Sequence, residues 1–142
     1  MFDRCSADTR RRRFHGNRRS LPAQYLTDAV AGLHGNFSLV AEVAGELIVA
    51  LASCVTVAAD LADIAVLVED DYQRQGIGST LLRLLVAHAD YSGVGTVQAT
   101  VLSEQEWILR LIRHYGDCST TVSMGAYEVT LHREKGRPAW IG

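Results

Sequence analysis

The most constraining feature of this sequence is an apolar run that leads through two glycines into a long amphipathic segment. The run Leu61–Val68 contains a single charge, Asp63, and predicts a central strand buried on both faces. Gly76 and Gly78 follow it. The segment Ile77–Tyr91 then carries a broad apolar stripe at helical spacing, formed by Ile77, Leu81, Leu82, Leu84, Leu85, Val86 and Ala89. A buried strand that turns through glycines into a long helix is typical of an α/β layer structure.

The remaining periodicities predict further elements around this unit. Strands are expected over Phe37–Val43 and residues 46–55, joined by a tight turn at Ala44 and Gly45, over Thr96–Leu102, and as a closing hairpin over residues 119–123 and 127–132. Helices are expected over residues 6–14, 23–33 and 104–116, the last opened by a capping box at residues 103–106. We therefore predict one mixed α/β domain over residues 1–142, with an irregular tail over residues 133–142.

Composition narrows the class of protein further. A chain of 142 residues that is 48% apolar can bury a core of its own. Cys5, Cys54 and Cys118 are odd in number and far apart, so we expect neither a disulfide framework nor a metal site, and Cys54 should be buried. No segment has the apolar length of a membrane span or the pattern of a signal peptide, and we expect a cytoplasmic protein.

The charges are distributed unevenly along the chain. Residues 1–19 form a basic helix or arm with seven arginines against two aspartates, whereas the rest has seven Lys or Arg and fourteen acids. A basic arm can bind nucleic acid, or it can be a solvated helix face whose arginines pair with acids elsewhere. We favour the second interpretation, because no aromatic residues alternate with the arginines. The acidic run Glu69, Asp70 and Asp71 could attract a cationic substrate, but a solvated loop is the simpler interpretation.

The glycine turn after residue 72 is the segment that best predicts a ligand-binding site. Two glycines at i and i+2 allow a sharp bend and leave backbone N–H groups exposed at the start of a long helix, which suits a pyrophosphate. Arg74 adds a positive charge beside them. The Walker pattern would need a lysine between Gly78 and Ser79, and the dinucleotide pattern would need a third glycine and an acid on Thr96–Leu102.

The segment Gln73-Arg74-Gln75-Gly76-Ile77-Gly78 resembles the acetyl-CoA signature Q/R-x-x-G-x-G/A of the GNAT superfamily of N-acetyltransferases. The likeness covers most of the chain. The strands of residues 38–55 and the helix of residues 104–116 resemble family elements, and residues 6–14, SADTRRRRF, are similar to the first helix of a bacterial branch that contains protein-lysine acetyltransferase domains.

This resemblance implies a central, mixed, mostly antiparallel sheet flanked by helices. It implies acetyl-CoA as co-substrate, and acetyl transfer to a primary amine, of a protein lysine or a small molecule, by direct attack in a ternary complex. The cofactor-binding residues would be Gln73, Arg74, Gln75, Gly76, Ile77, Gly78 and Ser79 around the pyrophosphate, with Val66, Val68 and Gln105 on the pantetheine arm. A main-chain N–H near Leu67 would polarise the thioester carbonyl. The strand Thr96–Leu102 would splay from its neighbour and leave a slot for the thioester.

The same resemblance places a catalytic glutamate of the lysine-acetylating branch at Asp63. Burial near the cleft would raise its pKa and make it a base, acting through water on the incoming ammonium. The alternative is a structural acid with satisfied hydrogen bonds. A tyrosine that many members use as general acid is replaced by Ile112, and Tyr115 and His114 are out of register, so the acid is unassigned. These departures leave open a non-catalytic acyl-CoA-binding regulatory module. The oligomeric state and the acceptor are not determined.

Overall fold

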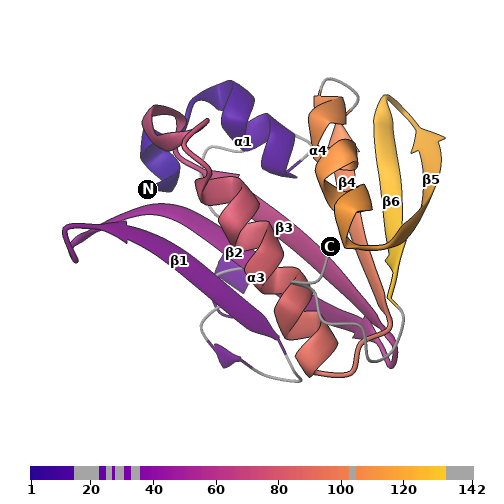
Figure 1. Ribbon diagram of the computed structural model, residues 1–142. Coiled ribbons are helices and arrows are strands. Elements are labelled where there is room, and N and C mark those ends of the chain that lie inside the picture. The colour runs from indigo at the N-terminus through magenta and orange to yellow at the C-terminus, as the bar shows by residue number, and fades with distance from the viewer. Residues whose placement is uncertain (15–22, 25–26, 28–30, 33–35, 103–104, 134–142) are drawn as a thin grey trace.

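The computed structural model describes residues 1–14, 23–24, 27, 31–32, 36–102 and 105–133. Its centre is a six-stranded sheet in the order β1-β2-β3-β4-β6-β5 (Figure 1). The strands are β1 Phe37–Val43, β2 Leu47–Ala58, β3 Leu61–Val68, β4 Thr96–Leu102, β5 Asp117–Ser123 and β6 Ala126–His132. Only β3 and β4 pair in parallel, and every other neighbouring pair is antiparallel. This confirms the expected mixed, mostly antiparallel sheet flanked by helices.

Helices cover both faces of this sheet. They are α1 Ala7–Phe14, α3 Ile77–Tyr91 and α4 Glu106–Ile112, with short 3-10 turns η1 Phe2–Arg4, η3 Asp70–Tyr72 and η5 Arg113–Tyr115. The bounds of α3 are those predicted, and it forms the crossover between the parallel strands β3 and β4. The helix expected over residues 23–33 lies largely outside the described residues, as do residues 103–104 of the expected capping box and the tail 134–142. The helix α4 begins at Glu106, two residues later than expected, with Gln105 at its N-cap.

The two hairpins close on tight turns with left-handed backbone. Ala44 and Gly45 have φ of 55° and 72°, and Met124 and Gly125 have φ of 49° and 77°, as the primed turns of hairpins require. Both hairpins are confirmed. β1 has the predicted bounds, whereas β2, β5 and β6 are longer than predicted. β2 extends to Ala58 because it pairs with β3 as far as Ala58↔Leu61, whereas its pairing with β1 ends at Cys54.

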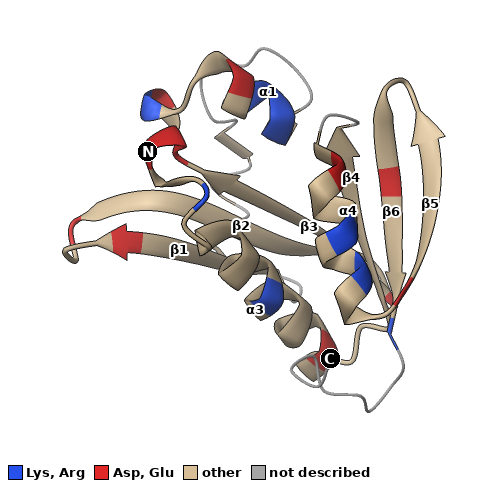
Figure 2. Ribbon diagram, turned by 45° about the horizontal axis from the view of Figure 1, so that its top comes forward, with Lys and Arg blue, Asp and Glu red and all other residues tan. Residues whose placement is uncertain are grey.

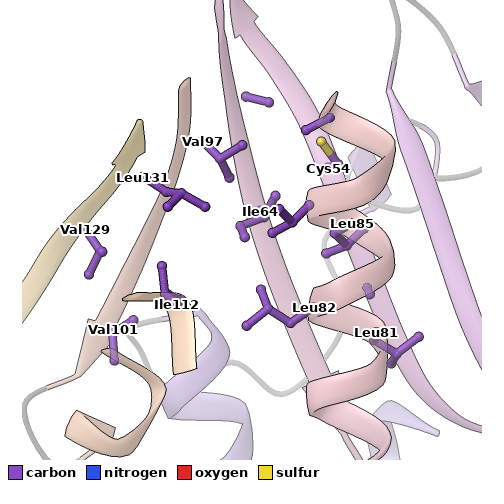
Figure 3. Close-up of a cluster of buried hydrophobic side chains, with 14 of the residues drawn as sticks. Cys54, Ile64, Leu81, Leu82, Leu85, Val97, Val101, Ile112, Val129 and Leu131 are labelled. Carbon is purple, nitrogen blue, oxygen red and sulfur yellow. The ribbon is translucent and has the colours of Figure 1, made fainter. Parts of the chain in front are cut away.

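The main core lies between α3 and the sheet. Figure 3 shows Leu82 and Leu85 of α3 on the side of the helix that faces Ile64 of β3. The buried members of this core are Ala50, Ala52, Cys54, Ala62, Ile64, Leu81, Leu82, Leu85, Val86, Ala89, Val97, Val101, Leu109, Ile112, Val129 and Leu131. Burial of Cys54 is thus confirmed. Leu84 lies at the edge of the predicted stripe and is 41% exposed.

A smaller apolar cluster lies on the opposite face of β3. It comprises Phe2, Cys5 and Leu67, with Met1 and Phe14 packed against it. The prediction that β3 is buried on both faces was therefore only partly right. Asp63 and Ala65, which share a face with Leu67, are half-buried, because this part of the strand lines a cavity.

Candidate active site

The site begins where the two parallel strands separate. β3 and β4 pair only at Leu61↔Thr96, Ala62↔Val97 and Asp63↔Gln98. Beyond this point β3 continues along β2 as far as Val68, and β4 continues along β6 as far as Leu102. The splay predicted between these two strands is thus present, and it opens the middle of the sheet at their carboxyl ends, where α/β proteins commonly bind ligands.

A cavity of about 690 Å³ occupies this opening. Its size is that of an ordinary small-molecule site. It is lined by the C-terminal halves of β3 and β4, the glycine turn, and residues of α1 and α4. The cavity therefore reaches both faces of the sheet, since α3 and α1 pack on opposite faces of β3.

The glycine turn forms one end of the cavity. Arg74 has φ of 60° and Gly76 has φ of 85°, so the backbone passes twice through the left-handed region before α3 starts. The first intrahelical hydrogen bond runs from Thr80 N to Gly76 O at 3.0 Å, and the helix has no side-chain cap and no acid in its first turn among the described residues. The amides of the first turn, the helix dipole and the Arg74 charge together suit an anion.

Most of the predicted cofactor residues line this cavity. They are Val66, Leu67, Val68, Gln73, Arg74, Gly76, Gly78, Ser79 and Gln105. Two predicted residues do not line it. The side-chain amide of Gln75 donates to the Asp71 carbonyl at 3.1 Å, and Ile77 packs against the main core. Only the backbone of these two residues is available to a ligand at the helix start.

The side chain of Gln73 holds two elements together. Its Nε2 donates to the Val68 carbonyl at 2.9 Å and to Thr9 Oγ1 of α1 at 3.0 Å. The first residue of the signature therefore fixes the end of β3 against α1. This role could not be read from the signature, because the partner Thr9 lies 64 residues away in the sequence.

The backbone of β3 presents polar groups to the cavity in alternation. Glu69 N donates to Val49 O of β2 at 2.8 Å. Because N–H groups alternate in direction along a strand, the amide of Leu67 also faces β2, and those of Val66 and Val68 face away from it, towards the opening left by β4. The amides directed into the opening near Leu67 are thus those of its two neighbours, and not its own.

Asp63 lies at the inner end of the opening. It is the last residue of β3 that pairs with β4, it is half-buried, and it lines the cavity. Burial, and then the negative charge of Asp63, raise the pKa of the nearby Cys54 thiol to about 11. The carboxyl group thus lies beside the point where β3 and β4 separate.

The acidic run after β3 attaches α1, and its interpretation as a solvated loop was wrong for two of its three residues. Glu69 is 5% exposed and binds Arg4 Nε through both carboxylate oxygens at 3.0 Å. Asp70 accepts from Ser6 N at 2.8 Å and from Thr9 Oγ1 at 2.9 Å. Only Asp71 is exposed. The expectation that arginines of the basic arm meet acids elsewhere in the fold is confirmed for Arg4.

Sequence reasoning missed several residues that line the cavity, among them two arginines and a tryptophan. Arg12 and Arg13 do so from α1, and Trp107 does so from α4. Figure 2 shows the basic part of α1 at the end of the helix that lies towards α4. The arginines were visible in the sequence, but the face of α1 that meets the cavity is set by its attachment to residues 69–73.

The two residues considered as a general acid do not line the cavity. Tyr115 packs against the main core, and burial raises its pKa. The ring of His114 is within 2.7 Å of the Arg110 carbonyl through Nδ1 and is exposed. Within the described ranges, no group of three or more His, Cys, Asp or Glu could hold a metal ion. No helix among these residues is long and apolar enough to cross a membrane.

Comparison with known proteins agrees with this geometry. The Acetyltransferase (GNAT) family matches residues 6–116. The GNAT domain of S. lividans PAT has a TM-score of 0.76 at 22% identity, over 92% of this chain and 80% of that one. The protein yncA from Salmonella typhimurium, solved with its cofactor acetyl-CoA, has a TM-score of 0.72 at 19% identity, over 92% and 87% of the two chains.

A third solved structure, a cAMP-binding acyltransferase from Mycobacterium smegmatis, is 28% identical with a TM-score of 0.62, over 94% of this chain and 41% of that one. A search of the curated proteins found no match. The family match extends from the cap of α1 to the end of η5. The chain belongs to the acetyltransferase (GNAT) family, and the prediction of an N-acetyltransferase enzyme is confirmed.

Proposed function

We propose that this protein transfers the acetyl group of acetyl-CoA to a primary amine, of a protein lysine or a small molecule, by direct attack within a ternary complex. The observation that carries the proposal is one cavity that joins the uncapped start of α3 to the splay between β3 and β4. A CoA thioester needs both features, because it has a pyrophosphate at some distance from its reactive carbonyl.

The first turn of α3 and Arg74 would hold the pyrophosphate. The pantetheine arm would lie in the splay, hydrogen-bonded to the main chain of Val66 and Val68 and reached by Gln105. One of the amides directed into the splay would polarise the thioester carbonyl. The amine nitrogen then attacks the carbonyl carbon, the C–N bond forms, the C–S bond breaks, and coenzyme A leaves as the thiolate.

Direct attack by the amine is supported by the raised pKa values and the positions of the three cysteine thiols. Burial raises the pKa of the Cys5 and Cys54 thiols to about 11 and also raises that of Cys118. A thiol with a raised pKa stays protonated near neutral pH and is a poor nucleophile. None of the three is among the cavity-lining residues, so a cysteine acyl-enzyme has no support here.

Asp63 would accept the proton that the amine loses, through a water molecule. The substitution Asp63→Asn keeps the size of the side chain and removes the base. We expect kcat/KM for the amine to fall by about 10²- to 10⁴-fold, with acetyl-CoA affinity unchanged by calorimetry. Glu128→Gln, which alters an exposed carboxylate on β6, is the matched control and should retain wild-type activity.

Two outcomes would contradict these assignments. If Asp63→Asn kept full activity with an unchanged pH profile, Asp63 would be a structural acid. If the folded wild-type protein gave no binding heat with acetyl-CoA, the proposed function itself would be wrong.

A further inference from the structure

A series of side-chain hydrogen bonds leads from α1 to the first residue of the glycine turn. Thr9 Oγ1 of α1 donates to Asp70 Oδ1 at 2.9 Å and accepts from Gln73 Nε2 at 3.0 Å. The same Nε2 also donates to the Val68 carbonyl at 2.9 Å. Figure 1 shows the loop between β3 and α3 beside α1. These bonds therefore join α1, the end of β3 and the start of the turn that is proposed to bind the pyrophosphate.

The backbone that follows Gln73 needs such support. Arg74 has φ of 60°, a left-handed conformation that a residue with a side chain adopts only at an energetic cost. The main-chain N–H of Gln73 donates to the Asp70 carbonyl at 3.2 Å, and its side-chain amide uses both of its N–H donors on Val68 and Thr9. The point from which the backbone enters the glycine turn is thus fixed by partners in β3, η3 and α1.

The hydroxyl of Thr9 has no donor left for a ligand. Thr9 is 7% exposed, and its hydroxyl proton is donated to Asp70 while Gln73 takes one of its acceptor positions. A phosphate binds to donors, so this hydroxyl cannot hold one directly, although Thr9 lies among the residues that line the cavity. An effect of the Thr9 hydroxyl on cofactor binding would act through Gln73.

We propose that Thr9 is a positioning residue for acetyl-CoA binding, and that it acts through Gln73 to hold the glycine turn in the shape that receives the CoA pyrophosphate. This inference rests on the proposed function. It adds to the cofactor site a residue of α1 that lies 64 positions from Gln73 in the sequence. Because coupling between two sites is reciprocal, a bound CoA also stabilises the attachment of α1.

Calorimetric titration with CoA tests the proposal, since CoA carries the pyrophosphate and binding needs no acceptor. Thr9→Val keeps the shape of the side chain and removes the hydroxyl. We expect the Kd for CoA to rise by about 3- to 10-fold, the range that corresponds to one neutral hydrogen bond. Thr9→Ser keeps a hydroxyl and should restore most of the wild-type affinity.

Hydrogen exchange measures the reciprocal effect. In the wild-type protein, CoA should slow the exchange of α1 amides, because a ligand that favours the docked helix opposes its local opening. The same concentration of CoA, relative to the Kd of each protein, should slow these amides less in Thr9→Val.

A double-mutant cycle shows whether Thr9 acts through Gln73. Gln73→Leu removes the amide that joins the turn to α1, and Thr9→Val added to that background should cause no further rise in the Kd for CoA. Arg4→Gln is the matched control. It loosens the same N-terminal segment by removing the pair with Glu69, but Arg4 is not among the described residues that line the cavity. Its Kd for CoA should stay within about twofold of wild type.

Three results would overturn the inference. They are wild-type CoA affinity in a Thr9→Val protein shown to be folded by thermal unfolding, an equal loss of affinity in Arg4→Gln, and a Thr9→Val effect that persists in the Gln73→Leu background. Unchanged exchange of α1 amides when CoA binds the wild-type protein would also overturn it, whatever the variants do. Each of these results leaves the proposed function standing, whereas no binding of CoA to the folded wild-type protein would overturn both.

Discussion

The two helices that border the cavity are attached to the sheet by different kinds of interaction. The helix α3 rests on the main core, to which it contributes five buried apolar residues. The helix α1 has no buried apolar residue among its own eight, and the one that is buried is Thr9. It is held by directed polar contacts from residues 69–73 and by the small cluster around Phe2.

The two ends of the proposed site are therefore held in place by different kinds of interaction. The pyrophosphate end is built on a helix held by non-directional burial, which is large and insensitive to pH. The α1 end of the cavity is built on a helix held by a few hydrogen bonds, each modest in net energy but dependent on exact partners. We expect α1 to open locally at a lower free energy than α3, as regions with few buried apolar contacts do.

The largest loss of stability is expected from a substitution in the core under α3. Leu85→Ala removes a side chain that is 0% exposed, and it should lower the free energy of unfolding by about 2–5 kcal/mol, since a cavity replaces lost contacts. Denaturant unfolding measures this change. Leu84→Ala, on the same helix but 41% exposed, should cost less than about 0.5 kcal/mol. Equal losses for the two variants would mean that α3 is not held by its buried face.

A smaller and more local loss of stability is expected when a contact that attaches α1 is removed. Thr9→Val keeps the shape of a buried side chain but removes the hydroxyl that donates to Asp70 and accepts from Gln73. We expect a loss of about 1–2 kcal/mol, seen in hydrogen exchange as weaker protection of α1 amides with α3 amides unchanged. Thr121→Val, on an exposed position of β5, is the control. Equal loss of protection in both helices would show that they open as one unit.

The same contrast explains what the sequence could predict. The bounds of α3 and β4 were predictable, because their apolar periodicity is local and follows from the face that each must bury. The glycine turn was predictable from its spacing alone. The splay of β3 from β4 came only through the family resemblance, since the register between distant strands leaves no periodic signal in either.

The attachment of α1 could not be predicted. Glu69 and Asp70 look like any solvated acidic pair, and their partners lie more than 60 residues away. A helix over residues 6–14 was predicted, but the Asp70 carboxylate that accepts from the Ser6 amide at its start was not. The position of Arg12 and Arg13 in the cavity depends on that attachment, and it was hidden for the same reason.

The smallest expected effect is a pH dependence confined to α1. Desolvation acts to raise the pKa of Asp70, but the hydrogen bonds from Ser6 and Thr9 outweigh it, and the net pKa lies below its ordinary value of 3.8. A carboxyl group with a lowered pKa in the folded protein stabilises it above the ordinary pKa, and this contribution is lost as the pH falls through the folded value.

The thermal midpoints of the wild-type protein and Asp70→Asn should therefore differ by a constant amount down to about pH 5 and converge below about pH 4. Asp117→Asn, an exposed acid at the start of β5, should show no such convergence. A difference that stayed constant to pH 3 would mean that the Asp70 carboxylate does not carry the attachment.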